Sequence, residues 1–367
     1  MLSFARGLIL FLAALVAIVS ALSAIESNEW WIRIWDFPRM QILATGTVLI
    51  IAALVVNHRH RIAISMVLGV ACAWQLYCIY PYTPFVPTEV AMVDKKLSNS
   101  ASCFSALSLN VYQDNLDYAR TERLIARENP DLLILLETDD RWAQALKRRL
   151  DDYPAVAARV LNNTYGMIVA TRLKARRMSV QVLTEPGTPS VFAFLETREG
   201  TPFKFVALHP RPPNPANDTE ERDAEIAIAA RLAARTPGAT LAIGDFNDVA
   251  WSHTSQLFKR IGGYLDPRVG RAPYATFPAG WPLLRWPLDH VFISPEFVVR
   301  SVRVLGDVGS DHLPIATNVC LAPAAGRSLN DAPAAPDDAD QEDTRQILRE
   351  YQEDTREDAE ERTKGKN

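Results

Sequence analysis

The chain has 367 residues, with 39 basic and 43 acidic side chains and a formal net charge of −4. Apolar residues make up 48% and charged residues 22%, close to the globular average, which excludes collagen-like, low-complexity and disulfide-scaffold proteins. The charge is unevenly distributed: residues 1–100 carry a net +2, residues 101–336 balance at zero, and residues 337–367 carry −6. We therefore treat the sequence as three compositional parts.

Three uncharged apolar runs occupy residues 7–25, 40–57 and 62–80. Each is close to the roughly 20 residues that cross a bilayer core of about 30 Å. None shows the amphipathic periodicity of a helix that packs on a soluble core. We therefore expect three transmembrane helices within residues 1–80, with a cleaved signal peptide as the alternative for the first run.

Basic residues next to these runs predict the orientation. Arg6 precedes the first run, and Arg59 and Arg61 lie in the tight turn between the second and third. Because Lys and Arg in short loops favour the cytoplasmic face, the N-terminus is expected inside the cell. Three crossings of the cell (inner) membrane then place everything after Tyr80 on the extracytoplasmic side, beginning with a linker over residues 81–97.

Residues 98–322 have the pattern of one α/β domain. About nine or ten short apolar segments, among them residues 103–111 and 131–137, alternate with three or four helical segments such as 219–234. This mixture predicts sheets packed together with helices outside. Cys103 opens the first predicted strand and Cys320 closes the last, so they form a disulfide if these strands are neighbours and are otherwise two buried thiols.

Polar side chains stand at the ends of several of these strands. They are Asn110, Glu137, His209, Asp245 with Asn247, Asp289, and Asp311 with His312. A carboxylate directly against an apolar strand is costly unless something neutralises it. Each residue alone is typical of an ordinary turn, but the ordered set predicts one shared polar site at one edge of the sheets.

The motifs that hold these residues occur in a characteristic order. They are Ser108-Leu109-Asn110-Val111, Leu135-Leu136-Glu137-Thr138, Tyr165-Gly166, Leu208-His209, Gly244-Asp245-Phe246-Asn247, Leu288-Asp289-His290-Val291-Phe292 and Ser310-Asp311-His312-Leu313-Pro314-Ile315. Over about residues 103–320 the chain resembles the endonuclease/exonuclease/phosphatase family, whose members include deoxyribonuclease I. The apolar N-terminus and Trp251-Ser252 resemble a membrane-anchored bacterial branch. The resemblance implies a four-layered α/β sandwich of two facing mixed sheets with outer helices.

The resemblance also implies a metal site. Hydrolysis of an anionic phosphoester needs a cation and oriented hydrogen-bond donors near the charge that develops. Glu137 would bind Mg²⁺ or Mn²⁺ through hard oxygen, with Asn110 and Asp311 as further or outer ligands.

Five other residues receive catalytic roles from the same resemblance. Asp245 would hold and deprotonate the attacking water, and Asn247 would orient it or bind the phosphate. His312 would donate to the phosphoryl oxygens, with Asp289 orienting its imidazole. His209 would protonate the leaving oxygen or bind phosphate.

The substrate is left open between a nucleic acid (DNA or RNA) and a phospholipid head group. The zero charge balance of residues 101–336 lacks the basic excess that is typical of a nucleic-acid surface. Arg211 either contacts substrate phosphate or lies in a solvated loop, and Trp281 and Trp286 either stack on a base, dip into lipid or pack in the core. We expect a membrane-anchored, metal-dependent phosphoesterase, with a non-catalytic membrane-tethered binding module as the alternative. Besides the bilayer and the substrate, no protein partner is predicted.

The tail over residues 323–367 is acidic and poor in apolar residues. Such a composition predicts disorder. The mixed charges beyond residue 340 support at most a transient solvated helix.

Overall fold

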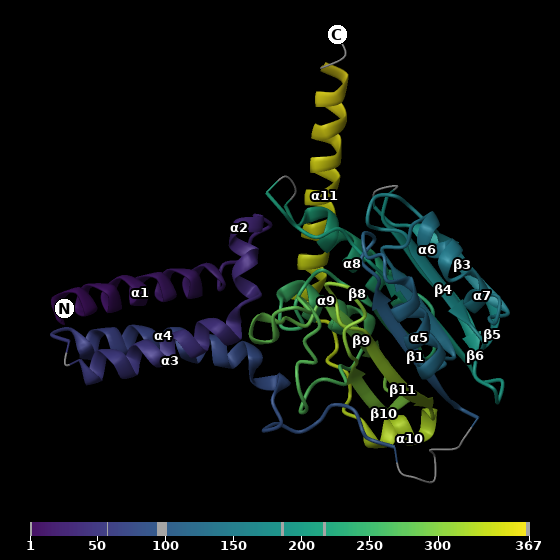
Figure 1. The fold of residues 1–367 in the computed structure, drawn as a ribbon, viewed down its shortest axis with the longest axis horizontal. Coiled ribbons are helices and arrows are strands. Elements are labelled where there is room, and N and C mark those ends of the chain that lie inside the picture. Colours follow the sequence, from purple (N-terminus) through teal and green to yellow (C-terminus); the bar gives the residue numbers. More distant parts are fainter. Residues whose placement is uncertain (1, 57, 94–100, 185–186, 216–217, 365–367) are drawn as a thin grey trace.

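The computed structural model describes residues 2–56, 58–93, 101–184, 187–215 and 218–364. Figure 1 shows an N-terminal bundle of apolar helices beside an α/β domain, from which a long C-terminal helix projects. The N-terminal bundle contains α1 (Leu2–Leu22), α2 (Trp30–Arg33), η1 (Ile34–Asp36), α3 (Arg39–Val55), α4 (Arg61–Ile79) and η2 (Tyr80–Tyr82). Its core is formed by apolar side chains of α1, α3 and α4, among them Ile9, Val16, Leu49 and Leu68.

The bundle supports the expectation of three transmembrane helices only in part. By length and composition, two helices can cross a membrane, over Ser3–Leu22 and Arg61–Tyr82. The segments Trp30–Asp36 and Arg39–Val55 are bent by 72° and count as a third span only if taken together. The break falls at Pro38, which has no N–H to donate and disfavours helix in the residue before it.

Eleven strands form two sheets in the described part of the domain. They are β1 (Cys103–Asn110), β2 (Leu132–Leu136), β3 (Ala155–Arg159), β4 (Met167–Thr171), β5 (Lys174–Val182), β6 (Pro189–Glu196), β7 (Pro202–Leu208), β8 (Thr240–Asp245), β9 (Asp289–Ile293), β10 (Phe297–Val304) and β11 (Ile315–Leu321). The strand orders are β10-β11-β1-β2-β4-β3 and β5-β6-β7-β8-β9. Both sheets are mixed, because β1 is parallel to β2 and β7 to β8 while the other neighbours are antiparallel.

The two sheets face each other and carry helices on their outer sides. The helices are α5 (Tyr118–Glu128), α6 (Asp140–Ala145) and α7 (Lys147–Leu150) over the first sheet, and α8 (Glu220–Ala234) and α9 (His253–Gly262) over the second. Strand β2 shows why the central strands are apolar throughout: Ile134 belongs to the core between the sheets, and Leu133 and Leu135 belong to the core under the helices. A strand buried on both faces has no polar side to alternate with. This arrangement is the predicted α/β sandwich.

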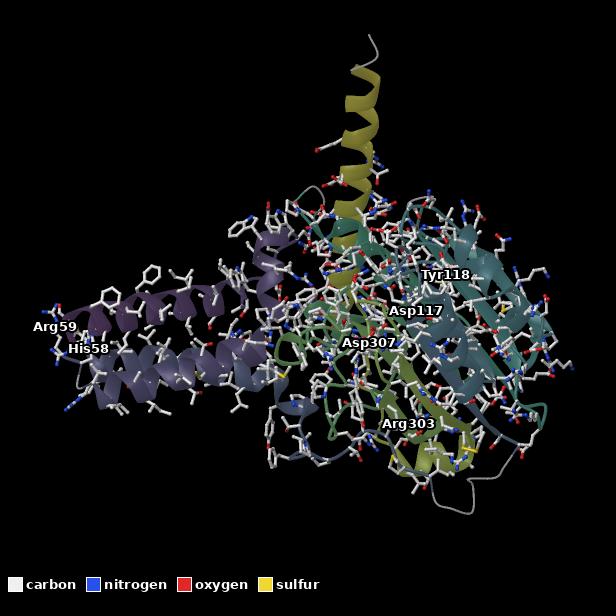
Figure 2. The ribbon with its side chains drawn as sticks, viewed as in Figure 1. His58, Arg59, Asp117, Tyr118, Arg303 and Asp307 are labelled. Atoms are coloured by element: carbon white, nitrogen blue, oxygen red, sulfur yellow. A yellow bond between two sulfur atoms is a disulfide. The ribbon has the colours of Figure 1, made fainter. Side chains whose placement is uncertain are left out.

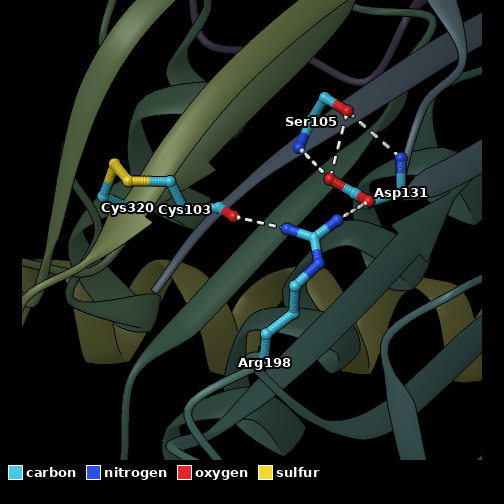
Figure 3. Close-up of a disulfide and its surroundings, with 5 residues drawn as sticks. All are labelled: Cys103, Ser105, Asp131, Arg198 and Cys320. Carbon is cyan, nitrogen blue, oxygen red and sulfur yellow. Dashed lines mark hydrogen bonds and ion pairs between the residues drawn. A yellow bond between two sulfur atoms is a disulfide. The ribbon is translucent and has the colours of Figure 1, made fainter. Parts of the chain in front are cut away.

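A disulfide joins the first and last strands of the domain (Figure 3). Cys103 and Cys320 are directly opposite each other in the β1–β11 pair, with their Cα atoms 3.9 Å apart. At the same end, Arg198 donates to the Cys103 carbonyl oxygen at 3.0 Å and to the carboxylate of Asp131. Of the two alternatives for the cysteines, the structure therefore shows the disulfide, at the opposite end of β1 from Asn110.

Buried ion pairs connect the N-terminal bundle to the domain. Arg33 of α2 pairs with Asp223 at 3.2 Å and with Asp248 at 3.7 Å, and also contacts Asp36 at 3.3 Å. Arg222 pairs with Asp223 at 2.8 Å and with Asp248 at 3.6 Å. We call these five residues the junction cluster. It fixes α2 to the loop after β8.

The predicted linker is packed where it is described. Val93 donates its N–H to the Val299 carbonyl oxygen at 2.9 Å, and Val299 donates to the carbonyl of Ala91 at 3.1 Å. The chain that leaves the N-terminal bundle thus runs beside β10 before it reaches the domain.

The tail differs from the expected disorder. The structure describes α10 (Pro323–Leu329) and α11 (Asp338–Lys364). The first half of α11 has specific partners on the domain: Asp340 pairs with Arg260 at 2.7 Å, and Asp343 with His253 at 3.2 Å. Ile347 packs on the apolar core of α8 and α9. A few well-placed contacts hold this helix against the domain although its overall composition is polar.

Candidate active site

The site forms where the strand ends of the two sheets converge. In the first sheet, Asn110 is the last residue of β1, and Glu137 follows β2 in a left-handed conformation with φ 61°. In the second sheet, Asp245 at the end of β8 is directly opposite Asp289 of β9. A hydrogen bond of 3.2 Å from Asn110 Nδ2 to Asp245 Oδ2 joins the two sheets at this edge.

Asn110 holds two carboxylates in place. Its amide nitrogen also donates to Glu137 Oε1 at 2.8 Å, while its own oxygen accepts from the Tyr112 N–H at 3.0 Å. The other Glu137 oxygen accepts from the Gln113 N–H at 3.2 Å. Asn110 is predicted to be a further or outer metal ligand, and in the structure its side-chain amide donates to both carboxylates. Its geometry is that of a residue that orients the ligands.

The carboxylates at this edge carry an excess of negative charge. Burial raises the pKa of Glu137 to about 7, against the Asn110 and Gln113 hydrogen bonds that lower it, and the charges of Asp311 and Asp245 raise it further. Burial also raises the pKa of Asp311, which in addition lies near Asp245. Crowded oxygen ligands of this kind are what a hard divalent cation prefers.

His312 lies between two aspartates. Its Nδ1–H donates to Asp289 Oδ2 at 2.9 Å, and its Nε2 is 3.4 Å from Asp245 Oδ2. Although burial lowers the pKa of His312, the charges of Asp245 and Asp289 outweigh it and raise the pKa to about 10. The imidazole is therefore positively charged at neutral pH. The ring of Phe277 packs against it, with ring centres 4.7 Å apart.

The ligand atoms of Asp245, Asp289 and His312 lie within 4.8 Å of one another, which is close enough for a shared metal ion. A charged His312 has no free lone pair on nitrogen to offer such an ion, and its Nδ1 is already committed to Asp289. Of the three, only His312 can donate a hydrogen bond to an anion, through Nε2. Glu137 and Asp311 supply oxygen ligands without that conflict.

His209 and Arg211 form one side of the site. His209 Nε2 is 3.8 Å from Asp245 Oδ2, and burial lowers the His209 pKa to about 4, so the ring is neutral at pH 7. Among the described residues its buried Nδ1 has no hydrogen-bond partner. The ring of Tyr165 packs against it, and the Arg211 guanidinium lies over the Tyr165 ring while pairing with Glu221 at 3.4 Å. Arg211 is thus at the margin of the site rather than at its centre.

Asn247 is held close to Asp245 by a tight turn. Its N–H donates to Asp245 Oδ1 at 2.9 Å, and its side-chain amide donates to the Pro210 carbonyl oxygen at 2.9 Å. Gly244 must be glycine here, because a Cβ would lie 2.0 Å from the Leu208 carbonyl oxygen. Arg222 of the junction cluster donates to the Asn247 carbonyl oxygen at 3.1 Å.

The structure therefore brings together all the strand-end residues that the sequence singled out. Three supporting residues were missed: Gln113, Arg222 and Ser310. Ser310 donates to the Asn110 carbonyl oxygen at 2.7 Å and accepts from the His312 N–H at 3.0 Å. Its place directly before Asp311-His312 was a usable signal. The sequence gives no comparable indication that Arg222 is buried beside the site, because charged residues in the first turn of a helix are usually solvated.

Comparisons with solved structures give distant likenesses. D. rerio TDP2 complexed with a single-strand DNA product is 19% identical and matches with a TM-score of 0.49, covering 59% of this chain and 99% of that one. The human Nocturnin catalytic domain with bound sulfate is 18% identical (TM-score 0.49; 60% and 95% covered). A mannosyl-6-phosphatase from Bacteroides thetaiotaomicron is 17% identical (TM-score 0.48; 59% and 99% covered).

A search of the curated proteins found no match. The model of the endonuclease/exonuclease/phosphatase family matches residues 107–312, which is more than half of the chain and includes every strand-end residue described above. On this evidence the chain belongs to the endonuclease/exonuclease/phosphatase family.

Proposed function

We propose that this protein is a membrane-anchored, divalent-metal-dependent phosphoesterase that hydrolyses a phosphodiester. One observation carries the proposal: four carboxyl groups, those of Glu137, Asp245, Asp289 and Asp311, are gathered in a buried site where His312 is the counter-charge. Such an arrangement is costly unless a cation completes it. Membership of a family of phosphoester hydrolases supports the same reading.

The residues present fit Mg²⁺ or Mn²⁺. Glu137 and Asp311 would hold the ion through oxygen, and Asn110 would keep the Glu137 carboxylate in position through its amide hydrogen bond. When bound, the ion supplies positive charge that polarises the phosphoryl group.

The remaining residues have distinct tasks in the proposed reaction. Asp245 accepts a proton from the attacking water, and Asn247, held 2.9 Å from it, orients that water or binds the phosphate. The charged His312 donates through Nε2 to a phosphoryl oxygen, while Asp289 fixes its ring. His209, neutral and with an unused buried Nδ1, binds the phosphate or assists the leaving oxygen.

The anchoring is proposed from the N-terminal bundle. His58 and Arg59 lie at the end of the bundle farthest from the domain (Figure 2), as expected if that end faces the cytoplasm. The Cys103–Cys320 disulfide supports an oxidising compartment for the domain. We therefore place the protein in the cell (inner) membrane of a bacterium with its α/β domain on the extracytoplasmic side. A reporter fused after Lys364 that reads cytoplasmic would overturn this topology.

The activity is tested with the full chain in lipid nanodiscs. Hydrolysis of bis(4-nitrophenyl) phosphate, plasmid DNA, RNA, phospholipids and inositol phosphates is measured with Mg²⁺, with Mn²⁺ and with EDTA. We expect metal-dependent turnover that falls by about 10²–10⁴-fold in Asp245→Asn. Asp151→Asn is the matched control, because Asp151 makes only an exposed pair with Lys147. Turnover that survives EDTA or Asp245→Asn would overturn the proposal.

A further inference from the structure

A loop over residues 276–288, here called the rim loop, links the site to the N-terminal bundle. At the site, the Ala279 N–H donates to the Asp311 carbonyl oxygen at 2.7 Å, and the ring of Phe277 packs on His312. At its far tip, the Leu283 carbonyl oxygen accepts from the side chain of Gln41 in the first turn of α3 at 2.9 Å. One continuous loop therefore touches both the reaction site and the membrane anchor.

The rim loop is held in a defined conformation. Arg285 donates back to the carbonyl oxygens of Pro278, at 3.4 Å, and Ala279, and the Leu284 N–H donates to the Trp281 carbonyl oxygen at 2.9 Å. These bonds satisfy the loop from within, so the positions of the tip side chains are fixed by the loop itself.

The tip of this ordered loop presents apolar side chains to the outside. Trp281 is 66% exposed, Leu283 89% and Leu284 44%. Trp286, by contrast, packs edge-on against Phe37 with ring centres 5.7 Å apart. Exposed apolar patches of this kind mark an interaction surface.

Further exposed apolar side chains lie, like the tip of the rim loop, near the domain-side ends of the apolar helices. Ile25 and Trp31 stand between α1 and α3, and Phe85, which is 81% exposed, follows α4 by a few residues. All lie in segments next to the domain-side ends of the apolar helices, where Figure 1 shows α2 and the loops of the domain facing the bundle. Aromatic and aliphatic side chains at this level are typical of a bilayer interface.

The length of the bundle agrees with this placement. Helix α4 has 19 residues, which at 1.5 Å each spans about 28 Å, close to the roughly 30 Å of a bilayer core. With the basic turn at residues 58–61 in one interface, the tip of the rim loop lies in the other.

We propose that Trp281, Leu283 and Leu284 insert into the bilayer interface beside the anchor, and that the site acts on the phosphodiester of a membrane lipid in that leaflet. This inference rests on the proposed phosphoesterase function and names its substrate class. The rim loop brings the site to the lipid surface, so a head group reaches it without leaving the membrane. A nucleic-acid strand would need cations along its path, yet the only cation of the rim loop, Arg285, is used within the loop.

Insertion is tested first, independently of activity. The full chain carrying Leu283→Cys is labelled with the environment-sensitive dye NBD and placed in phosphatidylglycerol–phosphatidylethanolamine vesicles that contain spin-labelled lipid. We expect blue-shifted emission and strong quenching. Leu329→Cys is the matched control, because Leu329 is 61% exposed and ends α10, which Figure 1 places away from the bundle. Wild-type chain labelled in parallel gives the background from Cys72 and Cys78. Equal quenching at 283 and 329 would overturn insertion.

Substrate class is tested with a variant in which Trp281, Leu283 and Leu284 are all changed to Ser. We expect Mg²⁺-dependent hydrolysis of lipid in those vesicles to fall at least 10-fold, while hydrolysis of water-soluble bis(4-nitrophenyl) phosphate stays within 2-fold. An equal fall for both substrates, no fall for either, or hydrolysis of single-stranded DNA but not of vesicle lipid would overturn the lipid assignment. If wild type hydrolyses neither ester, the proposed function fails instead, and the quenching result still decides insertion.

Discussion

The molecule buries acidic side chains in two neighbouring regions that differ in how their negative charge is neutralised. In the junction cluster, Asp36, Asp223 and Asp248 face Arg33 and Arg222, so the chain brings its own counter-charges. In the candidate active site, Asp245, Asp289 and Asp311 lie near His312, and Glu137 lies near Asp245 and Asp311. The two regions touch where Arg222 donates to the Asn247 carbonyl oxygen. The contrast is what we expect if the first cluster stabilises the fold and the second binds the proposed cation.

The largest effect is expected when a charge is removed from the site. Glu137→Gln should lower turnover about 10²–10⁴-fold, because a metal ligand is lost. The same change should raise the melting temperature of the metal-free protein, since a buried carboxylate next to Asp311 and Asp245 is neutralised. Turnover assays test the expected loss of activity, and thermal unfolding in EDTA tests the expected rise in melting temperature. A variant that is both inactive and less stable would contradict the comparison.

Removing a charge from the junction cluster should lower the stability of the fold, whereas Glu137→Gln should raise it in the absence of metal. Arg222→Met leaves the buried carboxylates of Asp223 and Asp248 to share Arg33 and should cost about 3–5 kcal/mol of unfolding free energy. Chemical denaturation of the detergent-solubilised chain measures it. Arg231→Met, on the exposed face of the same helix, is the control and should change stability by less than about 0.5 kcal/mol.

Another buried carboxyl, that of Glu225, lies outside both regions, and among the described residues it is bonded to hydroxyl groups rather than to an arginine. Ser190 donates to it at 2.7 Å and Thr184 at 3.4 Å, but burial dominates and raises its pKa to about 7. The folded state thus holds a proton that the unfolded state releases near pH 4.5. The contribution of Glu225 to the free energy of unfolding is therefore fully present below pH 4.5. As the pH rises to 7, the free energy of unfolding falls by about 3 kcal/mol.

Glu225→Gln should remove that part of the pH dependence. Unfolding free energies of wild type and variant, measured between pH 4.5 and 8, should diverge toward high pH, with the variant more stable. Glu122→Gln, at a half-exposed surface position, should run parallel to wild type. Curves for Glu225→Gln that also run parallel would show that Glu225 is charged in the folded state.

The smallest effect is expected from the metal itself. Mg²⁺ at about 100 times its dissociation constant should stabilise the wild-type fold by up to about 2.7 kcal/mol, because only the folded site binds it. Thermal unfolding with MgCl₂, against KCl of equal ionic strength, measures the shift. The shift should vanish in Glu137→Gln and persist in Arg231→Met. An equal shift in both variants would place the ion elsewhere.

The positions of the site residues could be predicted from the sequence because each lies at or near one end of an apolar strand. Asn110 ends a strand whose neighbours are apolar on both faces, and Asp245 and Asp289 flank two more. Local patterns do not, however, show which atom a side chain offers. The sequence could not show, for example, that the amide nitrogen of Asn110 donates to Glu137 and Asp245.

What could not be predicted depends on contacts between distant segments. Arg33 and Asp223 are 190 residues apart, and each alone looks like a solvated charge. The first half of α11 is ordered by Asp340 and Ile347, two residues in a strongly polar stretch, which composition cannot distinguish from disorder. The contact of the short helix α2 with the domain likewise depends on Arg33 reaching the distant Asp223.

The disulfide between the first and last strands has a mechanical consequence. If the N-terminal bundle is the proposed anchor, any load that passes beyond the junction cluster and the residues beside β10 reaches the start of β1, next to Cys103. Without a cross-link, a force at this end would separate β1 from β11 by breaking their backbone hydrogen bonds one residue pair at a time. The disulfide to Cys320 holds the first residue pair of the two strands together, so β1 cannot separate from β11 at that end and the load is shared by the hydrogen bonds of the whole sheet.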